Sequence, residues 1–332
     1  MAPDRERSRA AAGYQHGPPW VFKGSALYQL HLVKASTARA FVPPELRLVE
    51  AFGYTLGGMF LARYHDSPAG EFDELVVIAG IVWNPPTSCA WAARVLVNSA
   101  EACRHGRKEV GLPSHVATFS KTEADVLTSK SLVKPNKFLS VLGVGSTISE
   151  QPKGREIEIS ETEGSSTMHL CNISLPLSGS HKHHKWMGPA IRMSLPSFSG
   201  QTEDHPDLLK YSCQMECRVR PIKPAMIWSP RTTEPQERSD GKTSSTDSAD
   251  AQKQSISVLL SRPIFALEFN SLRMHVDAPK IVVPDCKKKL AAAAGGHRCG
   301  LLVSSLPQLQ TARGSLGVTP RVLVGGVDLV EA

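Results

Sequence analysis

Hydrophobic and polar residues alternate along several stretches of the chain. From Tyr211 to Arg220, Tyr, Cys, Met, Cys and Val occupy every second position, and polar or charged residues lie between them. Successive side chains of a strand point to opposite faces, so this period predicts a half-buried strand. By the same reasoning we expect strands over 27–33, 54–63, 75–83, 94–97, 116–120, 138–144, 156–160, 168–174 and 264–276.

Helical patterns are fewer and shorter. The sequence predicts a helix over 99–108, with Ser99 as its N-cap and Gly111-Leu112-Pro113 ending it. A shorter helix is predicted over 36–41, capped by Ser36 and ended by Pro43-Pro44. Many short strands with a few short helices indicate a mainly β (α+β) fold, a predominantly antiparallel barrel or sandwich.

Three segments lack these patterns. Residues 1–20 are charged, Ala-rich and nonperiodic, so we expect a flexible N-terminal arm. Residues 231–254 contain no Val, Ile, Leu, Met, Phe, Trp, Tyr or Cys, which predicts a disordered loop between two strands of one domain. Residues 285–332 read as a low-order basic tail, which leaves a single domain over 21–284.

Composition and charge exclude several classes of protein. A chain of 332 residues with 41% hydrophobic residues is neither wholly disordered nor a disulfide-stabilised miniprotein. No apolar run approaches the roughly 20 residues that a transmembrane helix needs. The net charge is +7, but seven basic and three acidic residues, a net +4, lie from Lys280 to the end, where there is no aromatic residue. We therefore expect no nucleic-acid binding.

Cysteine and histidine spacing predicts no metal site and no cofactor. The seven cysteines include no CxxC pair, and Cys213 and Cys217 share one face of a predicted strand. Four residues of strand span about 13 Å, too far for a disulfide, so both are expected to be packing residues. The histidines of the Ser180–Lys185 tract alternate with lysines, whose charge disfavours a bound cation.

The stretch from Glu101 to Lys121 combines a helix end, a Gly-Leu-Pro turn and the start of a strand. Together with residues 42–46, 64–66 and 70–74, it resembles the acetoacetate decarboxylase-like superfamily. That resemblance implies an antiparallel β-barrel with a cone-shaped cavity. Active members of the superfamily form a Schiff base with a lysine that follows a proline, and burial and a neighbouring lysine lower its pKa.

This chain departs from the superfamily at that lysine. Ser114 and His115 follow Pro113, where the superfamily has a Lys-Lys pair. Neither residue can form an imine, because only a free amine condenses with a carbonyl. Lys121 lies seven residues beyond Ser114, more than about 20 Å along a strand. We therefore expect no decarboxylation by the superfamily's mechanism.

The resemblance also suggests which residues border the cavity. The superfamily's upstream arginine falls near Lys23, one of its cavity glutamates falls at Phe60, and Glu74 matches the remaining one. The candidate cavity residues are therefore Glu74, Ser114 and His115, and no catalytic residue is assigned. An enzyme with a different chemistry would use Glu74 and His115 as acid and base.

Long strings over residues 18–280 also resemble a plant protein family required for making neoxanthin, a xanthophyll upstream of abscisic acid. This implies a non-decarboxylating ligand-binding or accessory protein rather than the enzyme that converts violaxanthin. Its expected partners are a hydrophobic, isoprenoid-like ligand or another protein of the xanthophyll pathway. A scaffold that uses the Ser/Thr-rich 231–254 loop is a further alternative. The N-terminus predicts no targeting peptide and hence the cytoplasm, whereas the pathway suggests plastids.

Overall fold

The structure is a computed structural model that describes residues 14–124, 154–163, 166–175, 187–229 and 246–282. The strands that it describes are β1 (Trp20–Lys34), β2 (Tyr54–Asp66), β3 (Phe72–Asn84), β4 (Thr87–Val97), β5 (Ser114–Ala124), β6 (Gly154–Glu163), β7 (Ser166–Leu175), β8 (Met187–Gly200), β9 (Leu208–Ile222), β10 (Met226–Trp228), β11 (Arg262–Val276) and β12 (Lys280–Ile281). The helices are α2 (Ala35–Arg39), α3 (Ala100–Glu109) and α4 (Thr246–Leu259).

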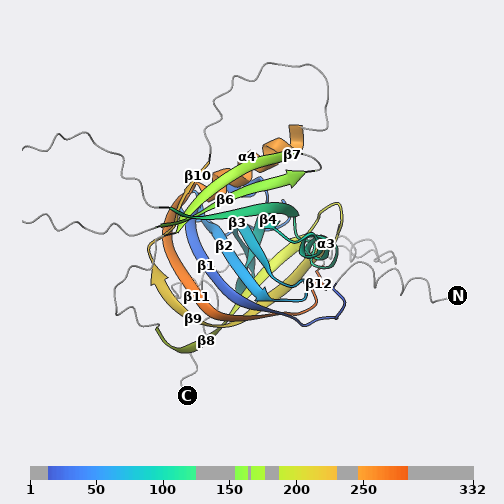
Figure 1. Cartoon of the computed structure of the whole chain (residues 1–332). Coiled ribbons are helices and arrows are strands. Elements are labelled where there is room, and N and C mark those ends of the chain that lie inside the picture. Colours follow the sequence, from blue (N-terminus) through green and yellow to red (C-terminus); the bar gives the residue numbers. More distant parts are fainter. Residues whose placement is uncertain (1–13, 125–153, 164–165, 176–186, 230–245, 283–332) are drawn as a thin grey trace, which may run out of the picture.

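Seven of these strands form a closed barrel (Figure 1). They follow the order β4-β3-β2-β1-β11-β9-β8, and β8 pairs again with β4. Every pair in the ring is antiparallel except β4 with β8, where Ala90 and Trp91 lie beside Ser197 and Phe198. The predicted mainly β fold, a largely antiparallel barrel with a few short helices, is confirmed.

A second group of strands extends from the barrel. Strand β5 pairs with β4 in parallel, and β6, β7 and β10 continue from β5 with antiparallel pairing. The parallel step arises because α3 and the turn after it carry the chain back along β4 before β5 begins. Figure 1 shows β6, β7 and α4 together at one side of the barrel.

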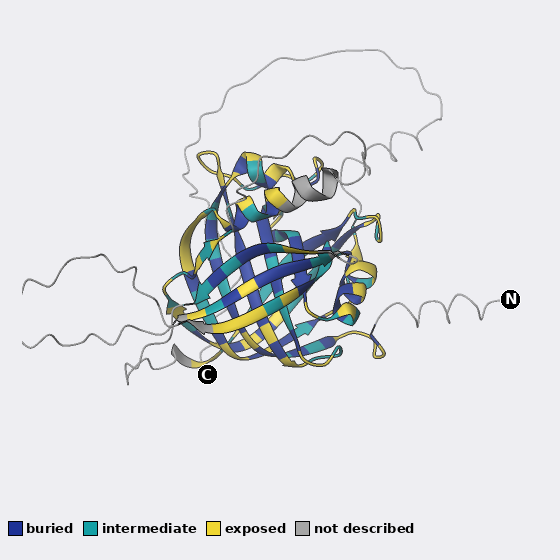
Figure 2. Cartoon of the chain, turned by 45° about the horizontal axis from the view of Figure 1, so that its top comes forward, coloured by how far each residue is buried: buried dark blue, intermediate teal, exposed yellow. Residues whose placement is uncertain are grey.

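Two hydrophobic clusters follow from the alternation of side chains. Figure 2 shows that buried residues run along the strands of the barrel. Along β1, Phe22 and Ala26 belong to the cluster inside the barrel. Leu27 and Val33, which lie on the opposite face of the same strand, belong to the cluster outside it. The outer cluster also includes Ile159 of β6 together with apolar residues of β7 and α4. Each strand of the barrel wall is thus buried on both sides over part of its length.

The helix caps match the predictions in one case and differ in the other. Ser99 caps α3, and its hydroxyl accepts a hydrogen bond from the Ala102 N–H at 3.2 Å. Ser36 does not cap α2, which begins at Ala35 with Lys34 at the N-cap position and no side-chain cap. Helix α2 follows directly from β1, so burial of Ala35 and Ala38 fixes its position instead.

Strand β8 was not predicted from the sequence. Its residues include Pro189, Pro196 and several serines, which obscure any two-residue period. Proline removes a hydrogen-bond donor from a ladder and is usually confined to strand edges and bulges. Here β8 is held by long antiparallel pairing with β9, from Ile191 beside Cys217 to Gly200 beside Leu208.

The segment predictions differ from the structure in two places. Tyr14 and Trp20, expected within a flexible arm, are buried at 8% and 5% exposure and pack into the inner cluster. Helix α4 covers 246–254, part of the stretch expected as a disordered loop, and Val258 and Leu259 at its end are buried. The predicted strand at 138–144 and the basic tail lie outside the described residues, and the domain boundaries remain a prediction.

The close approach of the paired strands β1 and β2 at Gly58 gives a first test. Gly58 has φ of +137°, and a Cβ built on it would lie 2.0 Å from the Gln29 carbonyl oxygen. Gly58→Ala therefore forces the two strands apart, and we expect it to lower the free energy of unfolding by more than about 3 kcal/mol. The measurement is urea denaturation followed by circular dichroism.

Gly70→Ala is the matched control. Gly70 also has a positive φ, +76°, but nothing lies within 4 Å of the added Cβ. This variant tests backbone strain alone, which costs about 1 kcal/mol. Equal losses for the two variants would contradict the close approach of β1 and β2.

Candidate functional site

The barrel encloses a cavity of about 170 Å³. Most of its wall is apolar, and helix α3 together with Tyr14 and Trp20 closes one end. The described polar residues that line it are Tyr14, Tyr28, Tyr64, Glu74, Ser88, His105, Ser114, Ser197, Tyr211 and Cys213. Glu74 is the one carboxylate among the described lining residues, and no lysine is among them.

Glu74 reaches the cavity because of its position in β3. Phe72, Glu74 and Val76 occupy alternate positions and all line the cavity. The Tyr64 hydroxyl on the neighbouring strand β2 donates a hydrogen bond to Glu74 Oε2 at 2.9 Å. Burial raises the pKa of Glu74 to about 7, because an apolar environment disfavours the charged carboxylate and the bond from Tyr64 offsets this only in part.

The hydroxyl and thiol groups around Glu74 stay protonated near neutral pH. Burial and the Glu74 carboxylate raise the pKa of Tyr64 and of Tyr14 well above the ordinary value of a phenol. Burial and the same carboxylate raise the pKa of Cys213 to about 12. A thiol with that pKa supplies almost no thiolate, so Cys213 is a poor nucleophile. This group offers hydrogen bonds rather than covalent chemistry.

His105 borders the same cavity from helix α3. The Tyr14 backbone N–H donates to His105 Nδ1 at 3.2 Å, and the two rings stack with centroids 3.7 Å apart. Because Nδ1 accepts, the proton of the neutral ring lies on Nε2. That atom is buried and has no hydrogen-bond partner within the described part of the chain. Burial lowers the pKa of His105 to about 4, so the ring is neutral above that pH.

Ser114 and His115, both predicted to border the cavity, lie on opposite sides of β5. Ser114 is 2% exposed and lines the cavity together with Glu74. His115 is not among the residues that line it; its Nδ1 lies 2.9 Å from Glu161 Oε1 on β6. The structure therefore differs from the expectation that Glu74 and His115 share one cavity. Adjacent residues of a strand face opposite ways, so only one of this pair can point inward.

Glu161 forms a buried polar cluster outside the barrel. It pairs with Arg94 of β4 and with His115 of β5, and both Arg94 and Glu161 are less than a tenth exposed. Burial opposes ionisation of Glu161, but hydrogen bonds from His115 and Arg94 outweigh it and lower its pKa. The His115 side chain thus joins β5 to β6 and has a structural partner.

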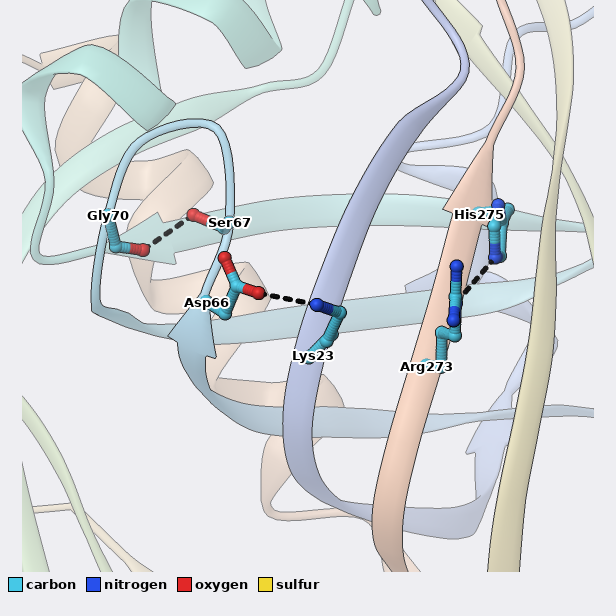
Figure 3. A network of polar contacts seen from close by, with 6 residues as sticks. All are labelled: Lys23, Asp66, Ser67, Gly70, Arg273 and His275. Carbon is cyan, nitrogen blue, oxygen red and sulfur yellow. Dashed lines mark hydrogen bonds and ion pairs between the residues drawn. The ribbon is translucent and has the colours of Figure 1, made fainter.

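Lys121 and Lys23, the two lysines considered from the sequence, point away from the cavity. Lys121 Nζ lies 2.6 Å from Asp73 Oδ1, on the face of β3 opposite to Glu74. Lys23, where the superfamily's arginine was expected, pairs with Asp66 at 2.7 Å on the outside of the barrel (Figure 3). Phe60, where a superfamily glutamate was expected, lines the cavity.

Of the three residues expected to border the cavity, Glu74 and Ser114 line it and His115 does not, and Tyr64, Tyr14 and His105 line it without having been expected from the sequence. Tyr64 lies two residues before Asp66 in a stretch that was noted only for its resemblance. His105 lies on the face of a helix that also buries Ala102, so an apolar stripe through α3 was the available signal. No group of three or more His, Cys, Asp or Glu side chains in the described residues can hold a metal ion.

Glu74 and His105 should give opposite contributions to the pH dependence of stability. The pKa of Glu74 is raised from 4.5 to about 7, so its contribution is lost as the pH rises through that interval. The pKa of His105 is lowered from 6.5 to about 4, so its contribution is lost as the pH falls through that interval. Each shift corresponds to at most about 3 kcal/mol.

The test is thermal and urea unfolding of two variants between pH 4 and pH 8. Relative to the wild type, we expect Glu74→Gln to gain stability as the pH rises, because it removes the buried acid. We expect His105→Asn to gain stability as the pH falls, since the amide oxygen keeps an acceptor for Tyr14 and does not titrate. Parallel pH profiles for both variants and the wild type would contradict these burial effects.

No protein family model matches the chain. Among solved structures, an acetoacetate decarboxylase from Legionella pneumophila is 12% identical with a TM-score of 0.48, covering 80% of this chain and 88% of that one. The enduracididine biosynthesis enzyme MppR is 11% identical with a TM-score of 0.46, covering 81% and 92%.

The curated relatives are far more similar in sequence. Protein NEOXANTHIN-DEFICIENT 1 of rice is 79% identical over 290 residues, which is 86% of this chain and 96% of the relative. The proteins of the same name from Arabidopsis and tomato are each 56% identical, over 85% and 80% of this chain and 99% and 92% of the relatives. At such identity over nearly the whole length of its relatives, this chain belongs to the NEOXANTHIN-DEFICIENT 1 family.

Proposed function

We propose that this protein supports neoxanthin formation by binding a small, apolar, oxygen-bearing ligand inside the barrel. The observation that carries this proposal is the composition of the cavity wall. It is mainly apolar, holds a single described carboxylate, Glu74, and has no described lysine. Enclosed apolar cavities with a few polar groups bind small hydrophobic molecules and fix their orientation through those groups.

The size of the cavity limits the ligand. About 170 Å³ is close to the roughly 150 Å³ that holds one benzene molecule, and below the roughly 300 Å³ of the smallest drug-sized sites. A single six-membered ring with its substituents fits this space. Neoxanthin is a xanthophyll, a long polyene with oxygen-bearing rings at its ends, so one end ring fits and the whole pigment does not.

The polar groups suit an oxygen on that ring. With a pKa of about 7, Glu74 carries a proton in a large fraction of molecules near neutral pH and can donate it in a hydrogen bond. Tyr64 is already engaged with Glu74 and can still accept. The Nε2–H of His105 adds a donor beside the same wall. A hydroxyl, carbonyl or ether oxygen would satisfy these groups.

The names of the relatives support the biological setting. Three plant proteins that share 56–79% identity with this chain are named for a deficiency of neoxanthin. We infer that this chain is likewise required for neoxanthin formation, and through it for the supply of material toward abscisic acid. We assign it an accessory or ligand-delivering role rather than the conversion of violaxanthin, because the cavity has room for one end ring and not for the whole pigment.

An acid–base enzyme is the second candidate, and the pKa of Glu74 favours it. A carboxyl group that titrates near neutral pH is suited to donating and accepting a proton in catalysis. Tyr64 would then be its hydrogen-bonded partner. The earlier pairing of Glu74 with His115 is not part of this candidate, because His115 faces Glu161.

Restoration of neoxanthin in a rice or Arabidopsis line that lacks its own relative separates the candidates. We expect the wild type to restore the pigment, as measured by chromatography of leaf extracts. Ala92→Phe should fail, because Ala92 lines the cavity and the added ring fills it. Glu74→Gln should still restore the pigment, since the amide keeps the shape and the bond from Tyr64.

These outcomes distinguish the ligand-binding protein from the acid–base enzyme when the variants and the wild type have the same protein level and melting temperature. Restoration by Ala92→Phe would contradict a role for the cavity. Failure of a folded Glu74→Gln would favour the acid–base enzyme, because the amide cannot transfer the proton.

Imine chemistry gives a further prediction. A Schiff base needs an unprotonated lysine at the substrate, and Lys121, the nearest lysine along β5, is engaged with Asp73. Borohydride treatment of the purified protein with acetoacetate should leave no covalent adduct detectable by mass spectrometry, and carbon dioxide should form only at the uncatalysed rate. A stoichiometric adduct on any lysine would overturn this expectation.

A further inference from the structure

The end of the barrel opposite to α3 has an apolar mouth. At this end β1 and β3 finish and β2, β4 and β11 begin, as the registers of the three pairs of neighbours show. The cavity wall extends toward it as far as Leu56, Ile81 and Ser88. One step further along the inward face of β2 and β3 come Tyr54 and Trp83.

The residues around this mouth are aromatic and exposed. Tyr54, Trp83 and Phe265 are 43%, 46% and 44% exposed. Phe265 has the same phase along β11 as Leu267 and Phe269 of the inner cluster, so it faces the barrel axis. The other end differs, because Tyr14 and Trp20 there are buried against α3. Exposed aromatic residues gathered at one place indicate an interaction surface.

Phe52 extends the same surface. It lies in the turn just before β2, and Tyr54, two residues later, pairs with Lys34 at the end of β1. The residue is fully exposed and its φ is +52°, in the left-handed region that a bulky residue rarely adopts. A strained backbone conformation that exposes an aromatic ring to solvent does not stabilise the folded protein. We refer to Phe52, Tyr54, Trp83 and Phe265 as the aromatic mouth.

Positive charge surrounds the aromatic mouth. Lys34, Arg47 and Arg262 are exposed and form no ion pair with a described residue. The Trp83 N–H donates to the Arg47 carbonyl, and Arg262 pairs with Leu32 in the β1–β11 ladder, so both lie at this end. The nearby acid Glu50 is already paired with Arg39 at 2.8 Å.

We propose that the aromatic mouth docks on the surface of a membrane that contains anionic lipids. Aromatic side chains are favoured at the boundary between headgroups and acyl chains, and unpaired basic residues are attracted to anionic headgroups. In this orientation the cavity faces the apolar phase, so a lipid-soluble ligand moves between bilayer and barrel without crossing water. The docking goes beyond the proposed ligand function and does not depend on it.

Flotation of the full chain with lipid vesicles tests this surface without any cavity ligand. The vesicles are pure phosphatidylcholine, or phosphatidylcholine with one third phosphatidylglycerol. We expect the wild type to float with the anionic vesicles. Phe52→Asn should bind about tenfold more weakly, because it removes one aromatic ring from the interface. Asparagine tolerates the left-handed backbone, so this variant should fold at least as well as the wild type.

Two further variants serve as controls. Ile281→Asn removes a 64% exposed apolar side chain at the opposite end of the barrel, and we expect no change in vesicle binding. Lys34→Gln should weaken binding to the anionic vesicles about fivefold and leave the neutral ones unchanged. Brominated acyl chains should also quench part of the tryptophan fluorescence of the wild type, and Trp83→Phe should lose that part.

The proposal is overturned if the wild type binds neither vesicle, which would leave the mouth as a surface for another protein. It is equally overturned if Phe52→Asn binds as well as the wild type, or if Ile281→Asn loses as much binding as Phe52→Asn. Loss of ligand binding in the cavity would not produce any of these results, so the two proposals fail independently.

Discussion

One edge of strand β4 is shared by two different strands, and the rest of the molecule depends on how that edge is divided. Near its start, Ala90 and Trp91 pair with β8 and close the barrel. Near its end, residues 95–97 pair with β5 and begin the outer layer. The turn after α3 holds the two together: the Gly200 N–H donates to the Gly111 carbonyl at 2.9 Å, and Ser199 Oγ donates to the Val110 carbonyl at 2.5 Å. A Cβ on Gly111 would lie 2.9 Å from Gly200, so this contact needs a residue without a side chain.

The division of β4 also decides which residues meet in the cavity. It places the start of β5 against the inside of the barrel, where Ser114 becomes part of the wall. The two-residue period of a strand then sends His115 outward to Glu161. The same rule applied to β3 puts Glu74 inside and Asp73 outside, next to Lys121. Local alternation and one shared edge together therefore account for the polar groups of the site.

Sequence patterns predicted more of the fold than of the cavity lining. Period-two stretches such as 211–220 predicted strands that the structure contains, and Ser99 capped its helix as expected. Strand β8 could not be predicted from the sequence, because prolines and serines mask its two-residue period and its pairing with β9 is a tertiary effect. The contact between His105 and Tyr14 could not be predicted for a similar reason, since the two residues are 91 positions apart in the sequence. Alternation reveals that two residues face opposite ways, but only the assembled barrel reveals which of the two faces inward.

The chemistry of the cavity follows from the charge type of the residue that the barrel encloses. An apolar enclosure disfavours whichever form of a group is charged, so it lowers the pKa of an amine and raises that of a carboxyl group. A buried lysine becomes a free amine near neutral pH and can attack a carbonyl. In this chain the enclosed group is Glu74, whose pKa rises to about 7, and the neighbouring His105 is held neutral. The same physical environment that would prepare an imine-forming lysine therefore gives, here, a carboxyl group that is protonated in a large fraction of molecules near neutral pH and an imidazole that is neutral. Neither group can condense with a carbonyl to form an imine.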